Sequence, residues 1–75
     1  MMDENLRDLI DKYGGKNSLI PLGYFKQVMF YAKHGVQPKF VYENEIKPRY
    51  LTCWYLKSDI TEVKAMWDKT NPKNI

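Results

Sequence analysis

The sequence has few of the residues that small proteins commonly use for disulfide bonds or structural metal sites. It contains one cysteine, Cys53, and one histidine, His34, among 75 residues. An internal disulfide needs two thiols, and a structural zinc site needs several Cys or His ligands, so the chain alone can form neither. No apolar run approaches the roughly 20 residues that span a bilayer. We therefore expect no metal, no cofactor and no membrane span, and a core built from apolar packing.

Signals for export are also absent from the sequence. The first residues read Met-Met-Asp-Glu-Asn, which is acidic where a presequence would be basic. A lone cysteine without such a segment is typical of a reducing compartment. We expect a cytoplasmic protein that forms a single domain over residues 1–75, with its core at about residues 4–70 and a frayed tail at residues 71–75.

The chain lacks the groupings that catalysis needs. An active site requires a nucleophile beside a base, paired carboxylates or a metal set. His34 stands at an expected helix end, where a cation is favoured, so we interpret it as a capping residue. Cys53 lies in a strand-like segment without an activating cation nearby, and we interpret it as a small buried apolar residue. We predict that the protein is not an enzyme.

The sequence is rich in aromatic residues and uneven in charge. Its two Trp, six Tyr and three Phe can supply much of the core of a short chain. The net charge is −2 over residues 1–15, +5 over residues 16–57 and zero over the last eighteen residues. A basic middle segment is typical of a surface that faces phosphates, and also of small domains whose charge serves only solubility.

Apolar spacing predicts two helices in the first half of the chain. The first covers residues 4–13, with Asp3 as candidate N-cap and Gly14-Gly15 at its end; its buried stripe is Leu6, Leu9, Ile10 and Tyr13. The second ends at Gly35, and its start has two readings. Ser18 as the cap leaves a four-residue turn between the helices, whereas a start at Pro21 leaves a longer connection. The buried face of this helix is expected at Leu22, Phe25, Met29 and Ala32.

The second half predicts a β-hairpin and a last helix. Residues 39–43 and 50–56 are rich in aromatic and β-branched residues, and the polar, proline-bearing residues 44–49 between them form the expected loop. The last helix begins at Ser58-Asp59 and stops at Asn71-Pro72; its buried stripe is Ile60, Val63, Met66 and Trp67. The predicted fold is a small α+β domain in the order helix, helix, β-hairpin, helix.

Two short motifs carry a resemblance to a known group. The stretch Trp54-Tyr55-Leu56-Lys57-Ser58-Asp59-Ile60, running on to Met66-Trp67, and the helix end Lys33-His34-Gly35 resemble the phage excisionase and MerR-like winged-helix DNA-binding domains. The similarity covers roughly residues 6–67. The chain departs from the group between Ser18 and Gly35, which is longer than the usual recognition helix and contains Pro21. The resemblance implies a helix-turn-helix whose second helix enters the major groove, with the hairpin as a wing on the backbone.

That resemblance makes double-stranded DNA the expected partner of a non-enzymatic accessory protein from a phage or mobile element. Cationic side chains would contact phosphates, and polar side chains early in the second helix would read base edges. The phosphate-contacting candidates are Lys16, Lys26, Lys33, Lys39, Lys47 and Arg49, and the base-reading candidates are Asn17, Ser18, Tyr24 and Gln27.

The alternative is a modulator or inhibitor that binds a protein, with a homodimer as a further possibility. The hairpin region carries more aromatic rings than one small core can hide, and exposed Tyr and Trp beside Arg are typical of interfaces. The interface candidates are Tyr42, Tyr50, Trp54 and Tyr55. Single-stranded nucleic acid is a third option, because aromatic rings beside cations can stack on bases.

Overall fold

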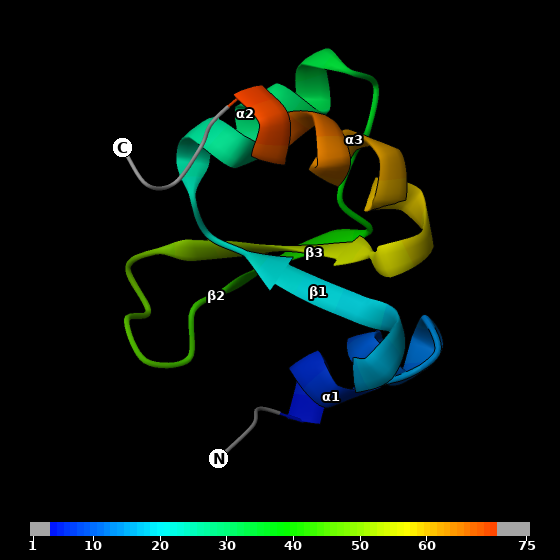
Figure 1. Cartoon of the computed structure of the whole chain (residues 1–75). Helices are drawn as coiled ribbons and strands as arrows, with labels where there is room; N and C mark the ends of the chain where they lie inside the picture. Colours follow the sequence, from blue (N-terminus) through cyan, green and yellow to red (C-terminus); the bar gives the residue numbers. More distant parts are fainter. Residues whose placement is uncertain (1–3, 71–75) are drawn as a thin grey trace.

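The computed structural model describes residues 4–70, and its elements follow the order helix, strand, helix, β-hairpin, helix (Figure 1). They are α1 (Glu4–Lys12), β1 (Leu19–Leu22), α2 (Phe25–Lys33), β2 (Phe40–Glu43), β3 (Leu51–Leu56) and α3 (Lys57–Thr70), with a short 3-10 turn, η1 (Lys16–Ser18), before β1. The α+β class is confirmed, but the predicted order lacked strand β1. The predicted cap at Asp3, the stop at Asn71-Pro72 and the tail lie outside the described residues.

The three strands form one antiparallel sheet with β3 at its centre, in the order β1-β3-β2. The register pairs Leu19 with Leu56 and Phe40 with Trp54. Side chains alternate between the two faces of a strand, so β3 supplies both faces of the sheet. Figure 1 shows α2 and α3 on one face and α1 on the other.

The second helix begins at neither of the two predicted positions. It starts at Phe25, because the preceding segment Leu19–Leu22 pairs with β3 as an edge strand. Pro21 fits there, since an edge strand tolerates a residue without an N–H group. Strand β1 thus separates α1 from α2, which lie on opposite faces of the sheet. The predicted order of two consecutive helices is therefore wrong, and a winged-helix order is not confirmed.

The buried face of α2 also differs from the prediction. Phe25 is 71% exposed and Met29 is 44% exposed, whereas Tyr31 is completely buried and Val28 packs beside it. Only three of the nine residues of this helix are polar, so both of its sides have apolar residues at helical spacing. Spacing alone could not decide which side faces the core.

Each face of the sheet has its own apolar core. On the α1 side, the buried residues are Leu6, Ile10 and Leu19, with Tyr13, Phe40, Tyr42, Trp54 and Leu56 packed around them. On the α2–α3 side, the buried residues are Tyr31, Tyr55, Ile60 and Val63. The predicted stripes of the first and last helices are confirmed in these buried positions, although Met66 is 41% exposed.

The predicted end of α2 at Gly35 is confirmed and has the hydrogen bonds of a Schellman motif. Gly35 has φ +80°, its N–H donates to Ala32 O at 3.0 Å, and the Val36 N–H donates to Tyr31 O at 2.9 Å. His34 is the C-cap residue, and its Nδ1 lies 2.9 Å from Phe30 O.

The start of α3 differs slightly from the prediction. This helix follows β3 directly at Lys57, so Asp59 lies inside its first turn instead of capping it. The Asp59 carboxylate instead meets Lys39 Nζ at 3.2 Å, which ties α3 to the residue that precedes β2.

Candidate binding surface

An open groove lies on the α2–α3 face of the sheet, between the first turn of α2 and the β2–β3 loop (residues 44–50). Leu22, Cys53 and Val41 are paired neighbours across the three strands, and they form its floor. The groove has a volume of about 450 Å³. We call it the α2-side groove, and its lining residues are Leu22, Gly23, Phe25, Val28, Val41, Arg49, Tyr50, Leu51 and Cys53.

The side chains around this groove are apolar and open to solvent. Tyr50 is 62% exposed, Leu51 64% and Val41 46%, and they face the exposed Phe25 of α2. Single exposed apolar residues are common on protein surfaces, but a contiguous group of them usually marks a binding site. None of these four residues belongs to the buried cores, so the fold itself leaves them without a partner surface.

The charge near the groove is positive. Arg49 is the only charged residue among those that line it. Lys47, two residues before it, lies with its Nζ 5.9 Å from the centre of the Tyr50 ring. Helix α2 contains no acidic residue, and its Lys26 and Lys33 are exposed. The lining of the groove therefore favours an anionic group at Arg49, while Glu43 is the cross-strand partner of Leu51.

Cys53 lies in the floor of the groove. Its side chain is half-buried, and this burial raises the pKa of its thiol above the ordinary value of 9.0. A thiol with a raised pKa is neutral near pH 7 and a poor nucleophile. The groove is thus suited to holding an apolar group rather than to reacting with one.

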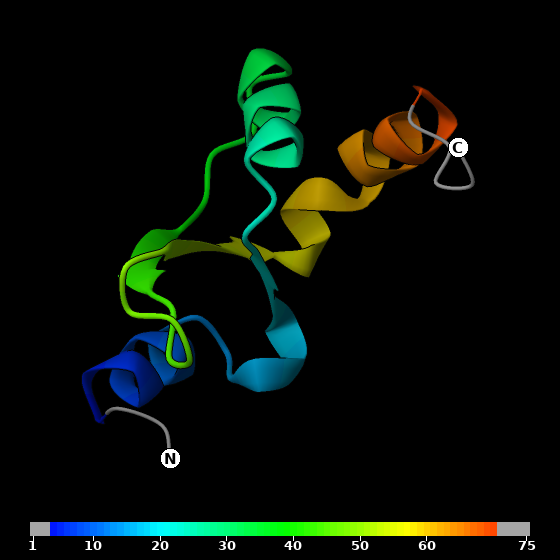
Figure 2. The ribbon, with the colours of Figure 1, turned by 90° about the vertical axis from the view of Figure 1, so that its left-hand side faces the viewer.

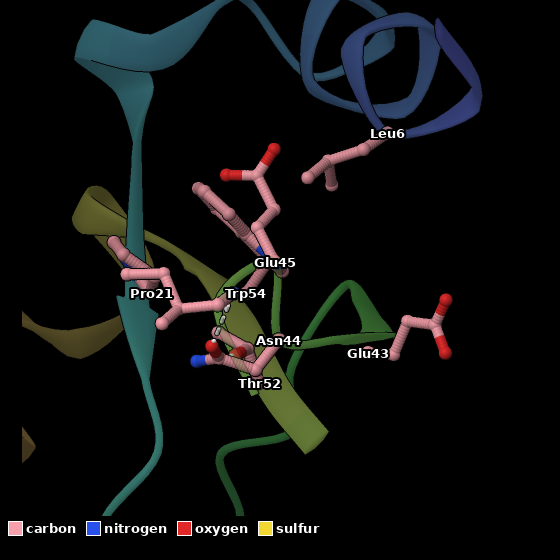
Figure 3. Close-up of a pocket in the computed structure, with 8 residues that line it drawn as sticks. Leu6, Pro21, Glu43, Asn44, Glu45, Thr52 and Trp54 are labelled. Atoms are coloured by element: carbon pink, nitrogen blue, oxygen red, sulfur yellow. Dashed lines mark hydrogen bonds between the residues drawn. The ribbon is translucent and has the colours of Figure 1, made fainter. Parts of the chain in front are cut away.

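A smaller pocket of about 210 Å³ lies on the α1 side of the sheet, beside the β2–β3 loop (Figure 3). Its polar lining is ordered by Asn44, whose side-chain amide donates to Thr52 Oγ1 at 3.3 Å. The Oδ1 atom of the same side chain accepts hydrogen bonds from the N–H groups of Ile46 and Lys47, each at 2.9 Å. The charged residues that line this pocket are Glu43 and Glu45, whereas the charged residue that lines the α2-side groove is Arg49. The full lining of the pocket is Leu6, Pro21, Glu43, Asn44, Glu45, Ile46, Thr52 and Trp54.

The residues predicted to contact DNA do not form one surface. Lys16, Asn17 and Ser18 lie in η1, which Figures 1 and 2 place on the α1 side of the sheet, away from α2. Lys39 is engaged by Asp59, and Gln27 donates to the Tyr31 hydroxyl at 2.9 Å. The remaining candidates lie on α2, at its N-cap or on the β2–β3 loop: Tyr24, Lys26, Lys33, Lys47 and Arg49.

Of the four predicted interface residues, only Tyr50 is exposed. Tyr55 is completely buried and packs edge-on against Tyr31 at 5.2 Å between ring centres. Trp54 is half-buried and stacks on Phe40 at 5.8 Å, and Tyr42 is half-buried on the same side. These three rings belong to the cores, because the sheet has a helix over each face and so hides more aromatic residues than one core could.

The sequence did not predict that three apolar residues of the groove, Phe25, Val41 and Leu51, are exposed. Phe25 was assigned to the buried face of its helix, and Val41 and Leu51 to strands without a specified surface. A signal existed in α2, which is apolar nearly all round although it is a short helix of a small protein. A domain this small can bury only one side of such a helix, so the apolar residues on the other side are exposed.

The wider comparisons do not place this chain in a known group. No family model, no curated protein and no solved structure matches it. Within residues 4–70, no helix is long and apolar enough to cross a membrane. The same residues contain no group of three or more His, Cys, Asp or Glu side chains that could hold a metal ion.

Proposed function

We propose that this protein is a small protein-binding domain whose α2-side groove holds an apolar segment of a partner. The observation that carries the proposal is the group of exposed apolar side chains that meet at one groove, Phe25, Val41, Tyr50 and Leu51. Exposed apolar surface costs solubility and contributes little to the fold, so a binding role is the physical reason to keep it.

The charge of the groove defines the chemistry of the partner segment. Arg49 borders the apolar floor, and a guanidinium binds a carboxylate through two parallel hydrogen bonds. An aliphatic or aromatic side chain would fill the space between Phe25 and Leu51. We therefore expect the bound segment to combine large apolar residues with an aspartate or glutamate.

A random peptide library displayed on phage tests this proposal without knowledge of the natural partner. The wild-type protein is immobilised, and bound clones are screened against two variants, Leu51→Asp and Ile46→Asp. Ile46 is 86% exposed but does not line the groove, so Ile46→Asp is a matched control for the loss of an exposed apolar residue.

We expect clones that carry apolar and acidic residues, that lose binding at least tenfold with Leu51→Asp, and that retain it with Ile46→Asp. A tenfold loss corresponds to about 1.4 kcal/mol of binding free energy. Clones that bind both variants as well as the wild type, or lose both equally, would contradict a role for the groove.

DNA binding is a second candidate, because α2 carries two lysines and no acidic residue. Lys26 and Lys33 are exposed on α2, and Arg49 faces the first turn of that helix across the groove. Among the described residues, the ion pairs involve Lys39 and Lys64, so none engages these three cations. Such a surface can neutralise phosphates and release counterions.

Fluorescence anisotropy of a labelled duplex at about 50 mM and about 200 mM salt tests this second candidate. Binding that weakens steeply with salt, and that a Lys26→Gln, Lys33→Gln double variant reduces, would support it. The matched control is Lys64→Gln, Lys69→Gln on α3, which removes the same charge from another helix. No binding at the lower salt concentration would exclude duplex DNA as a partner.

A further inference from the structure

One edge of the sheet is open to a further strand. Strand β2 pairs with β3 on one side only, and in the order β1-β3-β2 it forms an edge. Among the described residues no further strand pairs with β2 at that edge. The opposite edge is β1, which contains Pro21 and so lacks one of the N–H groups that a further strand would need.

The backbone of β2 presents specific groups at this open edge. The Asn44 N–H donates to Tyr50 O at 2.8 Å, so these two residues form a hydrogen-bonded pair of the antiparallel ladder. Such pairs alternate along a ladder. Phe40 and Tyr42 therefore bond to β3, whereas the N–H and C=O groups of Val41 and Glu43 point away from β3, toward the open edge. The regular alternation ends at Lys39, whose N–H turns back to β3 and donates to Trp54 O at 2.8 Å.

The sequence of this edge is complementary to itself in the antiparallel direction. Residues 39–43 read Lys-Phe-Val-Tyr-Glu, with a cation at one end, a carboxylate at the other and aromatic residues on both sides of a central valine. A second copy aligned about Val41 would place Lys39 opposite Glu43, Phe40 opposite Tyr42 and Val41 opposite itself. Opposite charges and aromatic pairs directly across an antiparallel ladder are both favourable.

We propose that two copies of this chain join through β2, in antiparallel pairing about a two-fold axis at Val41, to form a continuous six-stranded sheet. The outward N–H and C=O groups of Val41 would bond to those of the second copy. Lys39 already pairs with Asp59 of its own chain at 3.2 Å, and its partly exposed ammonium would meet Glu43 of the second copy as a further carboxylate. These two symmetric contacts would fix the register, since any other alignment brings apolar residues opposite charged ones. This inference goes beyond the proposed function, because it rests on the β2 edge and not on the groove.

The pairing would also change the shape of the binding surface. A two-fold axis perpendicular to the sheet leaves equivalent faces on the same side, so the two α2-side grooves would meet at the Val41 seam. Val41 lines the groove in each copy. A partner segment could then lie across both copies.

The seam is short, so the dimer dissociates on dilution. Strand β2 has four residues, and a stable interface commonly buries about 800 Å² on each partner. We expect a dissociation constant in the range of about 1 to 100 μM, which corresponds to a binding free energy of roughly 5 to 8 kcal/mol.

Sedimentation equilibrium of the full chain over a range of concentrations tests the proposal. The wild type should approach twice the chain mass of 9.0 kDa at high concentration. Glu43→Lys places two lysines opposite each other in both pairs, and we expect it to weaken the dimer at least tenfold. Glu45→Lys makes the same charge change two residues later, outside the strand, and should leave the dimer intact.

A mixing experiment separates charge pairing from a general loss of stability. Lys39→Glu is combined with Asp59→Lys, so that the ion pair within the chain is kept with its charges reversed. This double variant should also be monomeric, and an equal mixture with Glu43→Lys should restore dimers, because every cross-strand pair is then of opposite charge. Val41→Pro removes an outward N–H without touching the ladder to β3, and should be a folded monomer by circular dichroism.

Three results would overturn the proposal. A wild type that stays monomeric up to about 500 μM, well above the expected dissociation constant, would exclude the dimer. A Glu43→Lys variant that dimerises as well as Glu45→Lys would exclude this register. A series of species larger than the dimer would exclude a two-fold contact, since that contact closes at two copies. If the wild type is monomeric but still selects peptides through the groove, the dimer is excluded and the proposed function stands.

Discussion

The two faces of the sheet are covered to different extents, although the same three strands supply both. On the α1 side, the Tyr13, Phe40 and Trp54 rings form a continuous stack, with 5.8 Å between successive ring centres. On the α2–α3 side, the helices cover the sheet near Tyr55 and leave the end near Leu51 open. We therefore expect apolar residues on the first face to serve stability, and we propose that the exposed ones on the second face serve binding.

The largest effects are expected from truncating either buried core. Ile10→Ala removes packing on the α1 side and Ile60→Ala on the other, and each should lower the free energy of unfolding by about 2 to 5 kcal/mol. This is a large fraction of the roughly 5 to 15 kcal/mol that commonly stabilises a small domain. Urea denaturation measures both values.

The two tryptophans show whether the cores unfold together. Trp54 belongs to the α1-side core and Trp67 packs on the other one. In Trp67→Phe and Trp54→Phe backgrounds, the remaining tryptophan should report the same urea midpoint for each isoleucine variant. Midpoints that separate would show that the two faces are independent units.

Two phenylalanines, one on each face of the sheet, test this difference between the faces. Phe40→Ser breaks the aromatic stack and should cost about 3 kcal/mol of unfolding free energy, whereas Phe25→Ser, on the exposed wall of the groove, should change it by less than about 0.5 kcal/mol. Thermal or urea unfolding checks both. An equal cost for the two would mean that the groove side chains hold the fold together.

The α2–α3 core should also be sensitive to alkaline pH. Burial, followed by the neighbouring Cys53 and Tyr31 groups, raises the pKa of Tyr55 from 10.0 to about 12. The unfolded chain loses the Tyr55 proton near pH 10 and the folded chain only near pH 12, so stability present below pH 10 falls between these values, by up to about 3 kcal/mol. Unfolding free energies at pH 9 to 12 should fall less steeply for Tyr55→Phe; identical slopes would contradict this cause.

Smaller effects than those of truncating the cores are expected from removing single hydroxyl groups on this side. The Tyr31 hydroxyl accepts a hydrogen bond from Gln27 Nε2 at 2.9 Å, while the buried Tyr55 hydroxyl has no hydrogen-bond partner among the described residues. Tyr31→Phe should therefore cost about 1 to 2 kcal/mol, and Tyr55→Phe should be neutral or stabilising by about 1 kcal/mol. Calorimetry at neutral pH separates the two, and a costly Tyr55→Phe would show that its hydroxyl is paired.

The local elements of this fold were readable from the sequence where one signal dominated. The stripe of α1, the glycine end of α2 and the two hairpin strands were all predicted, because helical spacing, positive-φ glycine and β-branched content each point one way there. Strand β1 was missed because Leu19–Leu22 is short and Pro21 suggested the first turn of a helix. Its strand form depends on pairing with β3, thirty residues further along the chain.

The candidate site was predicted less well than the fold. Tyr50 and Arg49 were named, but Phe25, Val41 and Leu51 were not, because exposure depends on which part of each face the helices cover. The sequence identified the cationic residues but could not show which of them lie on the same surface. Lys16 and Lys26 are close in the sequence but lie on opposite sides of the sheet, since β1 runs between them.

Mapping of backbone amide shifts by NMR tests the central claim most directly. The protein is titrated with the tightest peptide from the display selection, and shift changes are compared between the two faces. The account predicts that changes gather at residues 22–25, 41 and 49–51, which line the α2-side groove. Changes gathered instead at Leu6, Thr52 and Trp54, around the α1-side pocket, would contradict the assignment of binding to the open face.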